Sequence, residues 1–226
     1  MIANTACFTK PEELFLIYRI QYGLEVIVFP DPLLDRTIRA AITDKVMPTN
    51  YIYDIDIDDI GFIYPSYLCI TNLEGIEHLD KLTSLYLHDT CVTDITPLAY
   101  LTNLDLLYIF NNNISNIAAV SNLSRLVYLY AYENNIEDVS PVSGLTMLKD
   151  LLLDNNNIED VSALSGLTNL VDLSLVGNRI VDIAPLIMNA SNGGLGEGDR
   201  VDINGNILAD TNQITVLRSY GVGVTY

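Results

Sequence analysis

Three tyrosines at alternate positions are the residues of this chain best suited to binding chemistry. Tyr128, Tyr130 and Tyr132 lie within the stretch VYLYAYENN, residues 127–135. Residues two apart in a β-strand point to the same face, so a strand here carries all three rings on one side. An exposed tyrosine offers a large apolar contact area and a hydroxyl group that orients a partner, whereas a buried one only stabilises the fold. The face on which the rings lie therefore decides whether they form a site.

Catalytic chemistry has little support in the sequence. A nucleophilic mechanism needs a base within hydrogen-bonding reach of a nucleophile. The chain has two histidines, and His88 has Asp89 beside it, but the spacing places no serine or cysteine next to either histidine. The sequence also contains no glycine-rich phosphate loop and no zinc-ligand cluster. We therefore expect a protein that is not an enzyme, has no cofactor and no metal site, and uses His88 as a surface or binding residue.

One acidic stretch is similar in part to a calcium-binding loop. YDIDIDDIG, residues 53–61, has aspartates at the first, third and fifth positions of such a loop. The glycine required at the sixth position is Asp59, however, and the glutamate required at the twelfth is Pro65. We expect Asp56 and Asp59 to cap the turn that leads into the following isoleucines, with a calcium site as the alternative.

The charge balance limits the kinds of partner. The 226 residues include 29 acidic and 11 basic side chains, and residues 47–226 alone hold 23 acidic and 6 basic ones. A surface this acidic repels the phosphates of nucleic acids and of anionic lipids, so we expect neither as a partner. No run of about 20 apolar residues is present to cross a membrane. Cationic partners and divalent ions remain compatible with the charge.

The amino-terminal sequence bears on the compartment. MIANTACFTKPEELFLIY has only a short apolar run, which follows Glu12 and Glu13 in place of the basic region of a signal peptide. Two expectations stay open: a cytoplasmic protein, or an extracellular or cell-surface protein whose leader was removed. Three cysteines do not decide between these compartments.

An internal repeat organises most of the chain. Six units of 22 residues follow one another without a gap and share the template L-x-x-L-x-x-L-x-L-x-x-N-x-I-x-D-I-x-P-L, as in LTNLVDLSLVGNRIVDIAPL (167–186). A seventh, partial unit, LGEGDRVDINGNIL (195–208), follows a short insertion. The six complete units begin at Ile57, Leu79, Leu101, Leu123, Leu145 and Leu167.

These units resemble leucine-rich repeat proteins, specifically the 22-residue subclass of internalin-like bacterial surface proteins. The resemblance covers residues 55–208. It implies an α/β solenoid, a right-handed horseshoe with a parallel β-sheet on its concave face, a helical amino-terminal cap and a carboxy-terminal cap. It divides the chain into a cap region (1–56), six repeats (57–188), and a degenerate repeat with the second cap (189–226). It also implies protein–protein interaction, with adhesion to a host or cell surface as the role of some members.

The pattern within each unit agrees with this architecture on physical grounds. The x-L-x-L-x segment alternates with period two and predicts a short strand. The remaining residues, about 17, are too few for a long helix and favour 3-10 turns. One column of asparagines is expected to form a ladder that bonds backbone groups of adjacent turns: Asn112, Asn134, Asn156, Asn178 and Asn206. A second column is expected to accept backbone amide bonds on a later turn: Asn72, Asp94, Asn116, Asp138, Asp160 and Asp182.

Local signals predict the elements that precede the repeats. Asp31 followed by Pro32 is typical of a helix start, with Asp as the N-cap and Pro in the first turn, and it predicts a cap helix within residues 29–42. Residues 9–23 have a further helical pattern that a glycine ends. Residues 24–29 predict a strand between the two helices.

The repeat register sets the face of the rings. Counting the first residue of a unit as zero, positions six and eight point into the core, so positions five, seven and nine point outward on the concave face. The predicted ligand-binding face has an aromatic half that includes one histidine: Phe62, Tyr64, Tyr86, His88, Tyr108, Phe110, Tyr128, Tyr130 and Tyr132. Its other half is acidic, and Asp150, Asp154 and Asp172 are expected to attract a basic segment of a partner.

We expect this face to bind a protein ligand, because a large exposed apolar patch is unusual for a monomer and tyrosine suits interfaces. Three alternatives stay open. The rings could serve only to stabilise the sheet. They could stack on sugar faces while nearby Asp and Asn side chains bond the hydroxyls of a glycan. The array could also be an intracellular scaffold of a complex.

Cys69 and Cys91 are 22 residues apart and hold the same position in consecutive units. Stacking brings their Cα atoms to about 5 Å, inside the range for a disulfide. A disulfide is therefore geometrically possible, and two reduced cysteines are the alternative.

Overall fold

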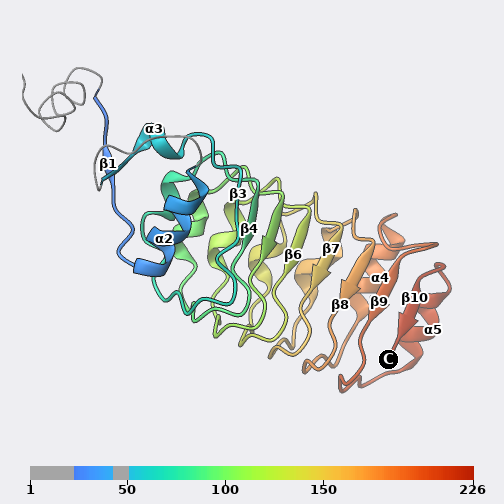
Figure 1. Cartoon of the computed structure of the whole chain (residues 1–226). Coiled ribbons are helices and arrows are strands. Elements are labelled where there is room, and N and C mark those ends of the chain that lie inside the picture. The colour runs from blue at the N-terminus through green and yellow to red at the C-terminus, as the bar shows by residue number, and fades with distance from the viewer. Residues whose placement is uncertain (1–22, 43–50) are drawn as a thin grey trace, which may run out of the picture.

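A parallel β-sheet runs through all the repeats of the computed structural model, which describes residues 23–42 and 51–226. Seven units contribute one strand each and the carboxy-terminal cap contributes the eighth (Figure 1). Equivalent residues of neighbouring units are paired, as in Tyr86 with Tyr108 and Tyr108 with Tyr130. The predicted solenoid and its 22-residue register are confirmed. The strands are β3 (Phe62–Ile63), β4 (Ser84–Tyr86), β5 (Leu106–Tyr108), β6 (Tyr128–Tyr130), β7 (Asp150–Leu152), β8 (Asp172–Ser174), β9 (Arg200–Asp202) and β10 (Gly223–Thr225).

The return path of each unit lies on the other side of this sheet (Figure 1). Five of these segments form short 3-10 helices, as the short return path predicts. The α-helix α4 (Ala184–Ser191) takes this place in the sixth unit, where the insertion separates paired Asp172 and Arg200 by 28 positions. The 3-10 helices are η1 (Ile76–His78), η2 (Thr96–Tyr100), η3 (Ala118–Asn122), η4 (Ser140–Val142) and η5 (Ser162–Gly166).

Aliphatic side chains fill the space between the sheet and the return path. The central strand residue is a leucine in β4 to β8, and each of these leucines is 0% exposed. Leu129 and Ala131 of the tyrosine-rich unit both belong to this core, so Tyr130 between them and the flanking Tyr128 and Tyr132 point away from it. The core is closed without any contribution from the outward side chains of the strands.

The asparagine column forms the predicted ladder. The Nδ2 group of Asn134 donates to the carbonyl of Ile109 in the preceding unit at 2.9 Å and to that of Ala131 in its own unit at 3.2 Å. Its Oδ1 atom accepts from the amide of Ile114 at 3.0 Å. Buried backbone groups of two adjacent turns are thereby satisfied. The same arrangement recurs at Asn112, Asn156, Asn178 and Asn206.

The second polar column also has the predicted structural role. Asp138 accepts from the amide of Ser140, two residues on, at 2.8 Å, and Asn116 does the same for Ala118 at 2.8 Å. Aspartate and asparagine are therefore interchangeable in this turn. The remaining members behave alike: Asn72, Asp94, Asp160 and Asp182.

A column of left-handed residues follows each strand, and the sequence analysis did not predict it. Position ten has positive φ in unit after unit, where glycine and asparagine are the least strained residues. Tyr67 (φ 63°) and Glu133 (φ 55°) adopt the same conformation, because the stacked turns on either side impose it. The column consists of Tyr67, Asp89, Asn111, Glu133, Asn155, Gly177 and Gly205.

The cap helix α2 (Pro32–Ala41) begins after Asp31, as predicted. One oxygen of Asp31 accepts from the amides of Leu33 and Leu34, and the other accepts from the amide of Thr71 at 2.9 Å. Burial by itself raises the pKa of Asp31, but these amide hydrogen bonds outweigh it and hold the pKa below its ordinary value. One carboxylate thus starts the helix and ties it to the first repeat.

The strand predicted over residues 24–29 is shorter in the structure. β1 (Val26–Ile27) pairs antiparallel with β2 (Ile52–Tyr53), outside the main sheet, and so extends only as far as its short partner. The helix predicted over residues 9–23 lies, apart from its final glycine, outside the described residues.

Short helices flank the repeats at both ends. In α3 (Asp54–Ile57), Asp56 accepts the amide of Tyr53 at 2.9 Å, which is the capping role expected of it. At the other end, α5 (Asn212–Arg218) packs beside β10, the last strand of the sheet (Figure 1).

A disulfide joins Cys69 to Cys91, with an S–S distance of 2.02 Å and a Cα–Cα distance of 4.7 Å. It connects the first two units. Leu68 and Thr90 occupy the ladder position of these units, so neither unit has a ladder asparagine. The covalent bond therefore links the two units that the amide ladder does not.

Candidate ligand-binding face

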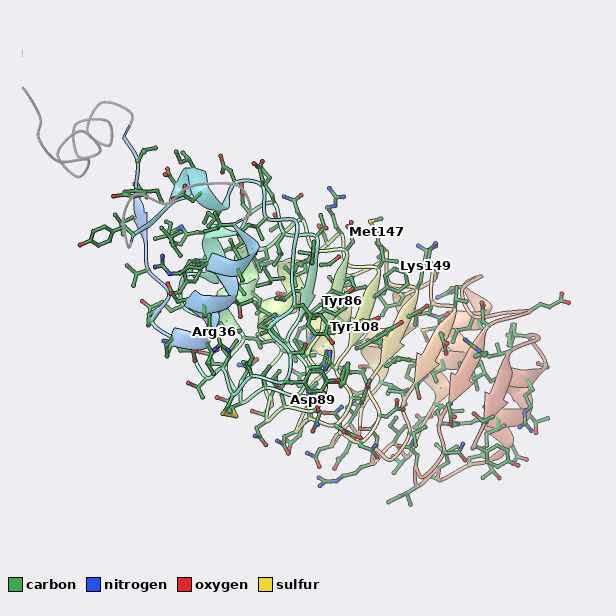
Figure 2. The ribbon with its side chains drawn as sticks, in the orientation of Figure 1. Arg36, Tyr86, Asp89, Tyr108, Met147 and Lys149 are labelled. Carbon is green, nitrogen blue, oxygen red and sulfur yellow. A yellow bond between two sulfur atoms is a disulfide. The ribbon has the colours of Figure 1, made fainter. Side chains whose placement is uncertain are left out.

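The outward side chains of β3 to β6 and of the turns that follow them form one continuous aromatic face. In Figure 2, Tyr86 and Tyr108 lie next to each other in front of the sheet, Asp89 lies toward one edge, and Met147 and Lys149 lie at the other. Hereafter "the aromatic face" means the ten rings of Phe62, Tyr64, Tyr67, Tyr86, His88, Tyr108, Phe110, Tyr128, Tyr130 and Tyr132.

Position seven of the first four units forms a row of tyrosines in ring contact. The centroids of Tyr64 and Tyr86 are 5.1 Å apart with tilted planes, and those of Tyr86 and Tyr108 are 4.9 Å apart edge to face. Tyr108 and Tyr130 stack at 4.4 Å with 15° between their planes. The parallel pairing of the strands sets this row, because it places equivalent residues about 4.8 Å apart.

Position nine forms a second row beside the first. His88 and Phe110 stack at 4.3 Å with 8° between planes, and Phe110 and Tyr132 stack at 4.2 Å with 11°. Rings stacked this closely cover each other's flat faces. The stacked pairs therefore present mainly ring edges to the concave side, with a hydroxyl group where the residue is tyrosine. Tyr64 and Tyr86 are instead tilted or perpendicular to their neighbours.

Exposure varies along the aromatic face. Phe62 and Tyr64 are 69% and 52% exposed at its amino-terminal end, whereas the rings of the second to fourth units, apart from buried His88, are half-buried. Tyr67 is 71% exposed and meets His88 edge to face at 5.1 Å, but the sequence analysis missed it. The strand alternation ends before position ten, and only the glycines and asparagines at this position in other units indicate the left-handed turn that directs it.

His88 was expected to be a surface or binding residue, and the surface part of that expectation is wrong, because its side chain is buried and the residue is only 5% exposed. Its Nε2 atom lies 3.2 Å from the hydroxyl of Tyr64, and its Nδ1 atom lies 2.8 Å from a carboxylate oxygen of Asp89. Phe110 covers one face of the ring. His88 thus holds neighbouring side chains of the aromatic face in place and offers a ligand almost no surface.

Asp89 is itself a left-handed residue, and this conformation directs its side chain toward its hydrogen-bond partners. One oxygen of its carboxylate lies 2.8 Å from Nδ1 of His88, and the other accepts from the side-chain amide of Asn111. These two hydrogen bonds, the larger from His88, lower the pKa of Asp89 below its ordinary value. Both oxygens of this carboxylate are therefore occupied by neighbouring side chains at the edge of the aromatic face.

The central tyrosines keep their protons well into the alkaline range. Burial is the largest cause that raises the pKa of Tyr108, Tyr130 and Tyr132 above the ordinary value of 10.0. The negative charge of Asp150 adds to the effect at Tyr108 and Tyr130. At neutral pH these hydroxyls are therefore uncharged, and the single proton of the Tyr130 hydroxyl is donated to Asp150.

The three acidic residues of the concave face differ in their surroundings. Asp154 accepts from the amide of Val176 at 2.8 Å and from the hydroxyl of Ser174. Asp172 forms an ion pair with Arg200 of the next strand. Asp172 and Arg200 hold the same position in adjacent units. Opposite charges at stacked positions signal such a pair, although it was not among the predictions from the sequence.

Asp150 has the least internal compensation of the three. It accepts one hydrogen bond, from the hydroxyl of Tyr130 at 3.2 Å. Among the ion pairs of the described residues, none involves Asp150.

Neither a metal-ligand cluster nor a membrane-spanning helix is found in the parts of the chain that the structure describes. No cluster of three or more His, Cys, Asp or Glu side chains there is arranged to hold a metal ion. The helices within residues 23–42 and 51–226 include none long and apolar enough to span a membrane.

Comparisons with known proteins agree with the repeat and the fold. A family model described as leucine-rich repeats (2 copies) matches residues 146–187, and the comparison with curated proteins gave no match. An internalin (inlF) from Listeria monocytogenes is 31% identical with a TM-score of 0.77, over 87% of this chain and 56% of that one. This chain thus spans little more than half of that structure.

Two further structures are similar. An internalin C2 (inlC2) from Listeria monocytogenes is 28% identical with a TM-score of 0.62, over 88% of this chain and 95% of that one. A leucine-rich repeat protein of Leptospira interrogans shares the fold at 19% identity and a TM-score of 0.59, over 67% of this chain and 39% of that one. From its repeat, its sheet and these similarities, the chain is a leucine-rich repeat protein with structural similarity to the Listeria internalins.

Proposed function

We propose that the protein binds a protein ligand through the aromatic face and has no enzymatic activity. The observation that carries this proposal is the position of the rings. Ten aromatic side chains lie on the open side of a sheet whose core is closed by aliphatic residues on the other side. Monomers rarely expose a contiguous apolar patch of more than a few hundred Å², and tyrosine gives large contact area at low entropic cost.

Sheet stability alone is the competing account of the rings. Cross-strand aromatic pairs contribute about 0.2–1 kcal/mol each, so the stacked rows do stabilise the sheet. Phe62 and Tyr67, however, are about two-thirds exposed and gain little from such contacts. Their exposure supports a docking surface that extends beyond the stacked rows.

A glycan is a weaker candidate ligand than a protein. Sugars pack their C–H groups on the flat faces of aromatic rings. In the stacks of Tyr108 with Tyr130 and of Phe110 with Tyr132, each ring covers one flat face of the other. Edges and hydroxyls suit the mixed apolar and polar surface of a protein. The net charge of −18 favours a ligand with a basic segment.

An extracellular or cell-surface location, with adhesion as the role, is part of the proposal. Disulfides persist in oxidising compartments and are rare in the cytosol, so the Cys69–Cys91 bond supports this location over that of an intracellular scaffold. The similarity to internalins agrees with it.

The double variant Tyr108→Ser/Tyr130→Ser tests the proposal. The probe is a set of labelled peptides selected from a phage-displayed random library on the wild-type protein, with affinities measured by fluorescence anisotropy. We expect binding to weaken by about 30-fold or more, because two central anchors are removed. The melting temperature should fall by only a few degrees, since the variant loses about 1–2 kcal/mol of ring stacking.

The matched control is Tyr100→Ser, which removes a 68% exposed tyrosine from the return path on the other side of the sheet. Its peptide affinity should equal that of the wild type. The proposal is wrong if the double variant binds as tightly as the wild type, and the rings are structural if the double variant unfolds.

A further inference from the structure

We infer that Asp150 and the adjacent rings of Tyr128 and Tyr130 form a subsite for an arginine side chain of the protein ligand. The inference rests on the proposed function and deepens it, because it names the chemical group that the concave face recognises. Within the acidic half of that face, it assigns the recognition to one residue, Asp150.

The carboxylate of Asp150 has unused capacity to accept hydrogen bonds. A carboxylate can accept about four of them, and Asp150 accepts one, from the hydroxyl of Tyr130. The two neighbouring acids are compensated within the chain: Asp154 by an amide and a hydroxyl, and Asp172 by Arg200. Of these three acids, Asp150 therefore has the fewest partners within the described residues.

A tyrosine ring lies directly beside this carboxylate. Tyr128 pairs with Asp150 across the parallel strands β6 and β7, which places their Cα atoms about 4.8 Å apart. Unlike the rings of positions seven and nine, Tyr128 makes no ring–ring contact within the described residues. The residue is half-buried, with Leu106 and Asp150 paired to it on the two neighbouring strands. A guanidinium group that pairs with Asp150 therefore lies beside the exposed part of the Tyr128 ring.

Arginine fits this combination better than lysine. A guanidinium group is planar, so it can lie over an aromatic ring while two of its N–H groups donate to one carboxylate. The ammonium group of lysine is a compact point charge without that geometry. The hydroxyls of Tyr108 and Tyr130 stay protonated at neutral pH and leave Asp150 as the charged member of the group.

The chain itself contains an example of the interaction. In the same column, one strand further on, the guanidinium of Arg200 pairs with the carboxylate of Asp172 while its side chain stays 73% exposed. The outward residues at position five of neighbouring units thus leave room for a guanidinium group beside a carboxylate. Asp150 presents the equivalent carboxylate, and no arginine of residues 23–42 or 51–226 pairs with it.

A titration with a capped tripeptide tests the inference on the whole protein. The probe is acetyl-Gly-Arg-Gly-amide, and its neutral isostere is the same peptide with citrulline in place of arginine. Tyrosine ring resonances are followed by NMR. We expect saturable shifts of Tyr128 and Tyr130 with the arginine peptide and at least about five-fold weaker binding of the citrulline peptide.

The variant Asp150→Asn should weaken the arginine peptide by at least about five-fold. Asp138→Asn is the matched control, because it removes the same charge from the far turn, where Asn116 already has the equivalent role. This control should bind like the wild type. Equal binding of the two peptides, wild-type affinity of Asp150→Asn, or no saturable shift up to about 50 mM overturns the inference.

Failure of this inference can be told apart from failure of the proposed function. Library-selected peptides that lose affinity with Tyr108→Ser/Tyr130→Ser but ignore Asp150→Asn show a working aromatic face without an arginine subsite. That result overturns the inference and leaves the proposed function in place.

Discussion

Aspartate occurs in several columns of this protein, and its neighbours decide what each one does. Asp138 accepts the amide of a turn, and Asp31 joins a cap helix to the first repeat. Asp89 holds His88 at the edge of the aromatic face. A carboxylate that already accepts several N–H or O–H groups attracts a new cation less strongly than a free one. At the scale of residues, Asp150 thus has fewer partners than Asp154 and Asp172 within the described residues and is the one of these three most open to a ligand.

The half-buried tyrosines predict that stability declines in alkali. Burial raises the pKa of Tyr108, Tyr130 and Tyr132 in the folded protein, whereas in the unfolded chain these phenols ionise near pH 10.0. Above that pH the unfolded state releases protons that the folded state retains, so the free energy of unfolding falls as the pH rises. Urea unfolding from about pH 8 to about pH 11 should show the decline beginning near pH 10.

The variant Tyr108→Phe/Tyr130→Phe is the control, because it keeps the rings and removes two of the ionising groups. Its decline should be shallower than that of the wild type. Parallel declines in the two proteins would contradict the assignment of this effect to the tyrosines.

The direction of the outward side chains was predictable from the sequence, but their contacts were not. Two-residue alternation places Tyr128, Tyr130 and Tyr132 on one face without any structural information. The burial of His88 depends on the rings of Tyr64 and Phe110 from adjacent units and on a left-handed residue just after it. Such contacts depend on rotamers and on positive φ angles, which a period-two pattern does not encode.

Neighbouring units are joined by different interactions at different points along the solenoid. From the third unit onward, an asparagine bonds the backbone of two adjacent turns. The first two units have Leu68 and Thr90 in that column and the Cys69–Cys91 disulfide next to it. Each repeat of a solenoid contacts only its neighbours, so a weak junction near one end affects that end most.

Loss of the disulfide should therefore destabilise the amino-terminal units selectively. The variant Cys69→Ser/Cys91→Ser opens a loop with a sequence separation of 22 residues, which corresponds to about 3 kcal/mol in the chain-entropy account. Urea unfolding measures the loss. Hydrogen exchange should show faster opening of β3 and β4 than of β7 and β8.

Asn113→Ser/Asn135→Ser is the matched control, since these residues hold the same template position in the third and fourth units. It should leave the urea midpoint almost unchanged. A cysteine variant as stable as the wild type, or one that exchanges faster uniformly along the sheet, would count against this role of the disulfide.

The elements themselves followed from local pattern to different degrees. The strands, the asparagine ladder and the start of α2 at Asp31 were predictable because each depends on spacing or on an adjacent cap. The length of β1 was not, because it depends on pairing with β2, about 25 residues later in the chain. Strand pairing over such a separation has no signal in the local sequence.

Over the whole molecule, one sheet separates a closed aliphatic core from an open side that changes along the solenoid axis. The open side is aromatic over the first four units and acidic or mixed over the rest. Because the repeats stack at a constant register, these side chains form an extended surface suited to a broad contact with another protein. The central claim of this account is that the ligand contacts that surface.

A backbone chemical-shift map of the protein with a library-selected peptide tests this claim most directly. Figure 1 separates the two sides of the solenoid, so the location of the shifts distinguishes them. The account predicts that the largest shifts fall in residues 62–67, 84–89, 106–111, 128–133 and 150–154. Largest shifts in the 3-10 helices of the return path, or in α2 or α5 of the caps, would contradict it.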